Sequence, residues 1–98
     1  MNNKQKAAIV ISEKDNVATA ISELKAGDSV VVRVGEEERQ IILKSDIKFL
    51  HKFALEDIVK EQHIIKYGQI IGETTTHIKQ GEHVHVHNLR SLRGLNSD

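Results

Sequence analysis

Apolar residues gather in short runs between polar turns along most of this chain, a pattern typical of a β-rich fold. Residues 29–34 and 38–43 are rich in Val, Ile and Leu, and they lie on either side of the turn sequence GEEE. Two such runs around a short polar turn predict a β-hairpin. The runs 7–11 and 63–67 are rich in β-branched residues, and each predicts a further strand.

The spacing of apolar residues becomes helical in two segments. In residues 16–24 apolar side chains recur every three or four residues, which predicts a short helix, and Asp15 or Asn16 would cap its first turn. A helical turn is also predicted at residues 54–59. Residues 44–51 have no clean period, and no element is predicted for them.

The C-terminal part of the chain is predicted to contain a bend at 69–72, a turn at 74–78 and a strand over Glu82–Asn88. In this strand three histidines alternate with two valines. Because side chains alternate between the two faces of a strand, the imidazoles are expected on one face and the valines on the other. Such a face is either a metal or proton-handling site, or an ordinary polar surface.

A four-residue pattern occurs three times, beginning at Leu24, Ile58 and Ile78. Each copy predicts an aliphatic residue on a single helical turn, then a tight turn, then a strand. The fourth residue is expected to have a left-handed backbone, which suits the glycines of the first and third copies better than Glu61 in the second. The unequal spacing excludes a solenoid, and chance similarity of short patterns is the alternative.

The length of 98 residues and the hydrophobic content of 39% predict one small domain. The expected architecture is a mostly β domain with short helices over residues 7–89, between a flexible N-terminal segment 1–6 and a polar tail 90–98. A domain of this size buries about 65% of its unfolded surface and is marginally stable alone, so a homo-oligomer or another partner is expected.

The charge balance and the aromatic content argue against nucleic-acid binding. Lys plus Arg and Asp plus Glu both number 14, and only two Phe and one Tyr could stack on bases. The chain has no cysteine, which excludes disulfides and thiolate metal sites. The apolar run 7–11 is too short for a signal peptide or a membrane span, so no membrane association and a cytoplasmic location are expected.

Four motifs occur in order along the chain. They are Asp15-Asn16-Val17-Ala18, HKFAL at 51–55, IIKYGQIIG at 64–72 and GEHVHVHN at 81–88. On these motifs the chain resembles the SAF-type small domain of the altronate and galactarate dehydratases, which has a β-clip fold. The last motif is more similar to the altronate branch, and it fits the small subunit of sulfolactate sulfo-lyase equally well.

The resemblance implies the small subunit of a hydroxy-acid lyase, an altronate dehydratase-like hydro-lyase that acts on sugar acids. In the full-length dehydratases a much larger catalytic domain follows, so a separate large catalytic subunit is expected here, without which the chain would be inactive. The family uses a divalent metal, typically iron or manganese, and zinc is a further candidate. The alternatives are a non-catalytic module that binds a sugar acid or acts as a scaffold, and a metal-responsive histidine protein.

Histidine chemistry makes the last motif a candidate site. An imidazole titrates near neutral pH and is a common ligand of iron, manganese and zinc. Same-face neighbours on a strand lie about 6.5–7 Å apart, so two of them can converge on one ion. On this spacing His85 and His87 are the expected metal ligands, and His83 is expected to act in catalysis. The alternative is a surface strand whose solvent face carries histidines.

Four other residues are candidates for contact with the substrate. His51 follows an irregular segment, and the resemblance implies a catalytic or supporting role for it. Lys66 interrupts an apolar strand, and its ammonium is expected in the site as a partner of the substrate carboxylate unless it faces solvent. Tyr67 could cap a pocket, and Asn88 could bind a hydroxyl group or hold a histidine tautomer. Their alternatives are a half-buried strand tyrosine and a loop-capping asparagine.

Overall fold

The computed structural model describes residues 8–92, and within this range the chain forms nine strands and no helix. The strands are β1 (Ala8–Ile9), β2 (Val17–Ala20), β3 (Ser29–Val34), β4 (Glu37–Ile42), β5 (Lys52–Ala54), β6 (His63–Lys66), β7 (Gln69–Thr74), β8 (His83–Val84) and β9 (Leu89–Ser91). A helix long and apolar enough to cross a membrane is therefore absent from this part of the chain.

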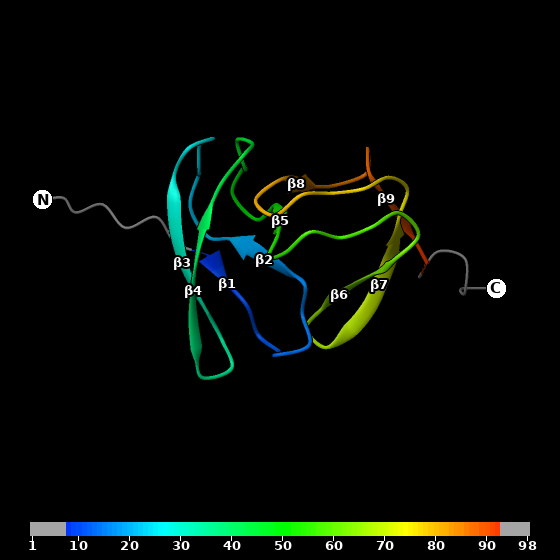
Figure 1. The fold of residues 1–98 in the computed structure, drawn as a ribbon, viewed down its shortest axis with the longest axis horizontal. Coiled ribbons are helices and arrows are strands. Elements are labelled where there is room, and N and C mark those ends of the chain that lie inside the picture. Colours follow the sequence, from blue (N-terminus) through cyan, green and yellow to red (C-terminus); the bar gives the residue numbers. More distant parts are fainter. Residues whose placement is uncertain (1–7, 93–98) are drawn as a thin grey trace, which may run out of the picture.

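The strands form three small antiparallel sheets that lie side by side (Figure 1). The central sheet has the strand order β1-β2-β5-β8. The hairpin of β3 and β4 lies on one side of it, and a sheet with the order β6-β7-β9 lies on the other. Strands distant in the sequence thus become neighbours in the central sheet, where β5 pairs with both β2 and β8.

The central sheet separates two hydrophobic cores. Because side chains alternate along a strand, Ala18 and Phe53 belong to one core, whereas Val17 and Ala54 belong to the other. The core next to the hairpin consists of Ala18, Ala20, Leu24, Val30, Val32, Val34, Ile41, Leu43, Ile47, Phe53 and Leu55. The core next to β6 and β7 consists of Val17, Ala54, Ile58, Ile64, Ile78 and Val84.

The predicted repeat is confirmed, and the structure adds a fourth copy that begins at Ile47. The four buried aliphatic residues pair as two isolated β-bridges, Leu24 with Ile47 and Ile58 with Ile78. Each lies in a bridge instead of on the predicted helical turn, and the predicted tight turn and strand follow it. The third residue after each has a left-handed backbone, with φ of 92° at Gly27, 72° at Leu50, 66° at Glu61 and 88° at Gly81.

The two bridged pairs are equivalent structural units. In the first, the N–H of Ala26 donates to Oδ1 of Asp46 over 2.9 Å. At the same place in the second, the N–H of Gln80 donates to Oδ1 of Asp57, also over 2.9 Å. The fold therefore contains an approximate internal two-fold repeat.

The predicted helices are wrong because both segments pair with distant strands or bridges. Residues 16–24 contain β2, and all four of its side chains are buried between neighbouring strands and the two cores. A strand that is buried on both faces lacks the alternation of apolar and polar residues by which a half-buried strand is recognised. Residues 54–59 contain the end of β5 and the bridging residue Ile58.

The predicted hairpin and the strand at 63–67 are confirmed as β3–β4 and β6. The bend predicted at 69–72 is wrong, since β7 runs through it. Gly72 suits this strand because a Cβ there would lie 2.4 Å from Leu89 Cδ1 on β9.

The strand predicted over Glu82–Asn88 is reduced to the two residues of β8, and the one at 7–11 to β1. The mostly β fold is confirmed. Residues 1–6 and 93–98, which the sequence assigns to a flexible end and a polar tail, lie outside the described residues.

Candidate functional site

The pairing of β5 with β8 brings two distant parts of the sequence together at a cluster of histidines. Phe53 lies opposite His83 in the register of these strands. Continued past Lys52 and Val84, the same register sets His51 opposite His85. The rings of His51 and His85 are stacked, with centroids 4.4 Å apart, and those of His51 and His83 lie 5.1 Å apart.

The cluster does not depend on the continuous strand predicted for this motif. β8 ends at Val84, and the chain then turns, so that Val86 is 81% exposed instead of buried with Val84. The expectation that both valines face the core is wrong for Val86. The ring of His87 still lies close to that of His83, with 5.3 Å between their centroids.

Asn88 closes the turn that carries His85 and His87. Its Oδ1 accepts a hydrogen bond from the N–H of His85 over 2.9 Å, and its Nδ2 donates to the carbonyl of His83 over 2.8 Å. Asn88 is itself buried. The side chain is therefore used by the backbone, as in the loop-capping alternative, and it fixes the positions of the histidines on either side.

Two imidazoles of the cluster, those of His83 and His85, favour the neutral form. Burial, followed by the nearby His51, His87, His85 and Lys52, lowers the pKa of His83 to about 4. Burial and the charges of His51, Lys52 and His87 also lower the pKa of His85. Both rings are thus neutral at pH 7, and a neutral imidazole offers the lone pair that a metal ion needs.

Three of the histidines fit a single metal ion. One ring nitrogen each of His51, His83 and His85 lies within 4.8 Å of the other two. His51 Nδ1 and His83 Nε2 are 2.9 Å apart and share one hydrogen bond. The pair expected from the strand spacing was His85 and His87, whereas the fold groups His85 with His51 and His83.

Lys52 follows His51 directly in the chain, although no pattern in the sequence singles it out as a site residue. It is half-buried on β5, opposite Thr19 of β2 and Val84 of β8. Burial and the charge of Lys66 lower its pKa. The signal that could have found it is its place next to His51 in the HKFAL motif.

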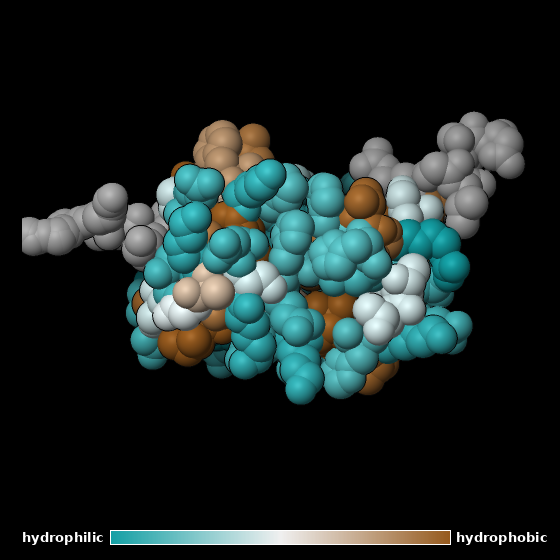
Figure 2. Space-filling model, turned by 90° about the horizontal axis from the view of Figure 1, so that it is seen from above, coloured by the Kyte–Doolittle hydropathy of each residue, from teal (hydrophilic) through white to brown (hydrophobic). Residues whose placement is uncertain are grey.

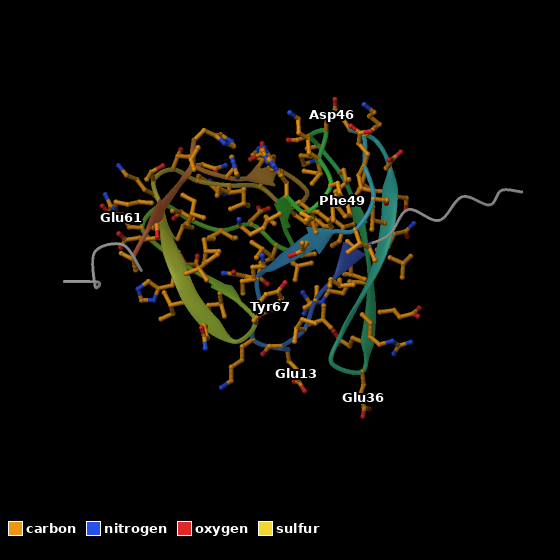
Figure 3. The ribbon with its side chains drawn as sticks, turned by 180° about the vertical axis from the view of Figure 1, so that it is seen from behind. Glu13, Glu36, Asp46, Phe49, Glu61 and Tyr67 are labelled. Carbon is orange, nitrogen blue, oxygen red and sulfur yellow. The ribbon has the colours of Figure 1, made fainter. Side chains whose placement is uncertain are left out.

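Lys66 and Tyr67 lie on the far side of the central sheet from the histidine rings, on the β6–β7 hairpin. Lys66 is half-buried, and its Nζ lies 4.9 Å from the centroid of the Tyr67 ring. Tyr67 is exposed at the hairpin turn, with φ of 56°. Figure 3 shows it near the turn that carries Glu13, away from β8. The structure thus does not bring Lys66 or Tyr67 together with the histidine rings.

Asp15 and Asn16 hold that hairpin in place. Oδ2 and Oδ1 of Asp15 accept hydrogen bonds from the N–H groups of Tyr67 and Gly68 over 3.0 and 2.8 Å. Oδ1 of Asn16 accepts from the N–H of Ile65 over 2.9 Å, and its Nδ2 donates to the carbonyl of residue 63 over 3.0 Å. The two residues were predicted to cap a helix, and they bind a distant hairpin instead.

The surface around the histidine cluster is open. Figure 2 shows the face above β8 in the view of Figure 1, which is mostly hydrophilic and carries separate hydrophobic side chains. Phe49 and Leu50 precede His51, Val86 lies between His85 and His87, and all three are exposed. Residues 8–92 enclose no pocket.

The comparisons with known proteins agree on one family. Residues 6–92 match the model of the altronate/galactarate dehydratase SAF domain. The chain is 42% identical to altronate dehydratase of Escherichia coli (strain K12) over 83 residues, which are 85% of this chain and 16% of that protein. It is 38% identical to altronate dehydratase of Bacillus subtilis (strain 168) over 86 residues, which are 88% of this chain and 16% of that protein.

A shorter relative matches along nearly its whole length. The chain is 35% identical to (2R)-sulfolactate sulfo-lyase subunit alpha of Chromohalobacter salexigens over 88 residues. These residues cover 87% of this chain and 94% of that subunit. The same region is thus a small part of the altronate dehydratases and almost the whole of the sulfo-lyase subunit.

Proposed function

The chain belongs to the altronate/galactarate dehydratase SAF domain family, and from this premise we propose that it is the small subunit of a hydroxy-acid lyase. It acts with a separate large catalytic subunit on a sugar acid, as an altronate dehydratase-like hydro-lyase. The 35% identity to a sulfo-lyase subunit alpha, over 94% of that subunit, supports this role.

The observation that carries the proposal is the convergence of His51, His83 and His85, whose ring nitrogens lie within 4.8 Å of one another. We assign these three residues as ligands of a divalent metal, iron or manganese, with zinc as a further candidate. When bound, such an ion acts as a Lewis acid toward an oxygen of the substrate. The neutral state of His83 and His85 supports this assignment.

The remaining groups have roles in binding and proton transfer. Removal of water from a hydroxy acid needs a base for the proton beside the carboxylate and an acid for the departing hydroxyl. His87 lies outside the group of three nitrogens and is exposed beside His83, so it is the imidazole left to carry a proton. Lys66 keeps its expected role as a cation for the substrate carboxylate.

The large subunit is proposed to cover the histidine cluster. Exposed apolar side chains flank it on both segments, Phe49 and Leu50 on one and Val86 on the other. Burial of such side chains against a partner stabilises a complex by about 25 cal/mol per Å² of apolar surface. Closure by the partner would also exclude water from the imidazoles.

The test combines the purified chain with a large dehydratase subunit from the same genome, with altronate or sulfolactate and with Fe²⁺ or Mn²⁺. We expect each of His51→Ala, His83→Ala and His85→Ala to lower the rate by at least about 100-fold, as loss of a metal ligand would. His77→Ala removes an exposed histidine from another turn and serves as the matched control.

Metal binding by the isolated chain gives a second readout through the electron paramagnetic resonance of Mn²⁺. Wild-type rates and wild-type Mn²⁺ binding in His85→Ala would refute the metal assignment. Tight binding of a sugar acid without metal, and without activity beside any large subunit, would instead indicate a non-catalytic binding module.

A further inference from the structure

The four copies of the repeat provide four equivalent turns that can be compared with one another. In each copy the four residues after the bridging aliphatic residue form a tight turn, and the third of them has a left-handed backbone. These turns are 25–28, 48–51, 59–62 and 79–82. A feature that is found in only one of the turns can therefore be judged against three internal references.

In three of the turns a side chain of the last residue closes the turn. The side-chain oxygens of Asp28, Gln62 and Glu82 each accept a hydrogen bond from the N–H of the first residue of their own turn, over 2.8, 3.1 and 2.9 Å. Two of these acceptors are carboxylates and one is an amide. An oxygen acceptor at this N–H is thus a regular part of the turn.

The turn 48–51 lacks this closure. Its last residue is His51, whose Nδ1 lies 2.9 Å from Nε2 of His83 in the histidine cluster. No side chain among residues 8–92 accepts a hydrogen bond from the N–H of Lys48 in its place. The turn that carries a proposed metal ligand is therefore the one that the described part of the chain leaves open.

The same turn also differs at its tip. In the other three copies the two tip residues are small or polar, namely Ala26-Gly27, Lys60-Glu61 and Gln80-Gly81. Here they are Phe49 and Leu50, which are 59% and 58% exposed. The left-handed backbone of Leu50, with φ of 72°, is unfavourable for a residue with a Cβ. Exposed apolar side chains on a strained backbone indicate a contact with another molecule.

We propose that the turn 48–51 is the anchor by which the large subunit recognises this chain. The inference rests on the proposed function, which supplies the partner. An apolar pocket of the large subunit receives Phe49 and Leu50. An oxygen acceptor beside this pocket binds the N–H of Lys48, and it closes the turn as the chain's own oxygens do in the other copies. A stable interface takes about 800 Å² from each partner, so these two side chains act as a hot spot within a larger contact.

Binding at this turn also restrains a metal ligand. His51 is the last residue of the turn, and its N–H donates to the carbonyl of Lys48 over 2.9 Å. Closure of the turn by the partner restricts the backbone from which the imidazole reaches the cluster. The metal ion and the large subunit then favour the same conformation, and by linkage each raises the affinity for the other by the same factor.

The test measures association of the chain with a large dehydratase subunit from the same genome by analytical ultracentrifugation, with metal removed by a chelator. We expect Phe49→Ala to weaken the complex by at least about 10-fold, as loss of an aromatic anchor does. Val59→Ala is the matched control, because Val59 is also 59% exposed and belongs to the equivalent turn 59–62. Figure 3 shows that turn, which contains Glu61, far from Phe49.

Amide hydrogen exchange reports on the N–H of Lys48 directly. In the isolated chain this amide should exchange at least about 10-fold faster than those of Lys25, Val59 and Lys79, which have acceptors. The large subunit should slow the exchange of Lys48 and leave the other three unchanged. Saturating Mn²⁺ should tighten the wild-type complex by about 5-fold or more, and this gain should be absent in His85→Ala.

Equal association of wild type and Phe49→Ala, or a Lys48 amide that the large subunit does not protect, overturns the inference. Self-association of the wild type that Phe49→Ala abolishes also overturns it, because the turn would then bind a second copy of the chain. No gain from Mn²⁺ in the wild-type complex overturns the coupling. Mn²⁺ binding by the isolated chain tests the proposed metal site separately, since Phe49 is not among the grouped histidines.

Discussion

Two polar clusters lie within this small domain, and they differ in how their groups are satisfied. Asp15 and Asn16 are 6% and 5% exposed, and their side chains bind four backbone groups of the β6–β7 hairpin. The histidines are less buried, and their only mutual hydrogen bond joins His51 to His83. Their other neighbours are stacked imidazoles and Lys52, whose positive charge disfavours protonation of His85.

The difference separates a structural cluster from a functional one. A buried polar group with every partner supplied by the chain stabilises the fold and leaves nothing for a ligand. Imidazoles whose ring nitrogens converge without a partner for each from the chain indicate a site for a ligand. The two clusters should therefore respond in opposite ways to substitution and to added metal.

The largest effect on stability is expected at the first cluster. Asn16→Ala leaves the N–H of Ile65 and the carbonyl of residue 63 without their partners, which should lower the free energy of unfolding by about 3 kcal/mol. Urea unfolding measures it, with His85→Ala as the contrast that should change little. Equal losses in the two variants would remove the distinction between the clusters.

In the presence of added metal, the histidine variants should differ from the wild type more than variants of the Asp15–Asn16 cluster do. Mn²⁺ at about 100 times its dissociation constant should stabilise the wild type by about 2.7 kcal/mol, since it binds only the folded chain. The gain should vanish in His51→Ala, His83→Ala and His85→Ala, and it should persist in Asp15→Asn, whose fold is weakened elsewhere. Thermal unfolding with and without metal measures it, and a gain retained in all three histidine variants would contradict the site.

The sequence predicts those elements whose stabilising contacts are local. The β3–β4 hairpin is visible because two aliphatic runs adjoin a polar turn. β2 cannot be predicted in this way, because its pairing depends on β1 and β5 and its burial on both faces depends on the two cores. The repeat is likewise only partly predictable, since three of its copies are recognisable in the sequence. The fourth copy has Leu50 at the left-handed position, where glycine or a polar residue would be expected.

The candidate site is predictable to the same extent. The motif of three histidines marks the chemistry, but the third member of the metal group, His51, is supplied by the register of β5 and β8. No local pattern encodes that register, because the two strands are joined only through distant pairing. Lys52 lacks a sequence signal for the same reason, since its central place in the sheet follows from the pairing of β5 with β2 and β8.

A smaller effect is expected from pH on the metal-free chain. The folded-state pKa of His83, about 4, lies below the unfolded value of 6.5, so the unfolded chain binds more protons between these values. Stability is then fully present above pH 6.5 and is lost as the pH falls toward 4. Because the ring is only partly buried, screening limits the loss to about 1 kcal/mol.

Urea unfolding at intervals across this pH range tests the effect, with metal removed by a chelator. Burial and the charges of His51, His87, His85 and Lys52 lower the pKa of His83, so they should carry the effect together. His83→Gln should flatten the profile, whereas His77→Ala should leave it unchanged. A profile of His83→Gln as steep as that of the wild type would assign the pH dependence to other groups.

The smallest effect is expected at the backbone beside the histidines. Leu50 and Glu61 occupy equivalent left-handed positions in the repeat, where two other copies have glycine. A left-handed backbone costs an L-residue about 1–2 kcal/mol, and glycine loses part of that gain through its greater freedom in the unfolded chain. Leu50→Gly and Glu61→Gly should therefore each stabilise the fold by about 0.5 kcal/mol in urea unfolding.

Only one of these two substitutions should affect the partner. The exposed Leu50 side chain precedes His51, whereas Glu61 lies in the turn between Ile58 and β6. If Leu50 is retained for contact with the large subunit, Leu50→Gly should weaken the complex in analytical ultracentrifugation while Glu61→Gly does not. Equal association of both variants would mean that the strain at Leu50 has no function. Weaker association of Leu50→Gly alone would show that the strained backbone at Leu50 presents a side chain that the partner contacts, whereas the same strain at Glu61 serves no contact.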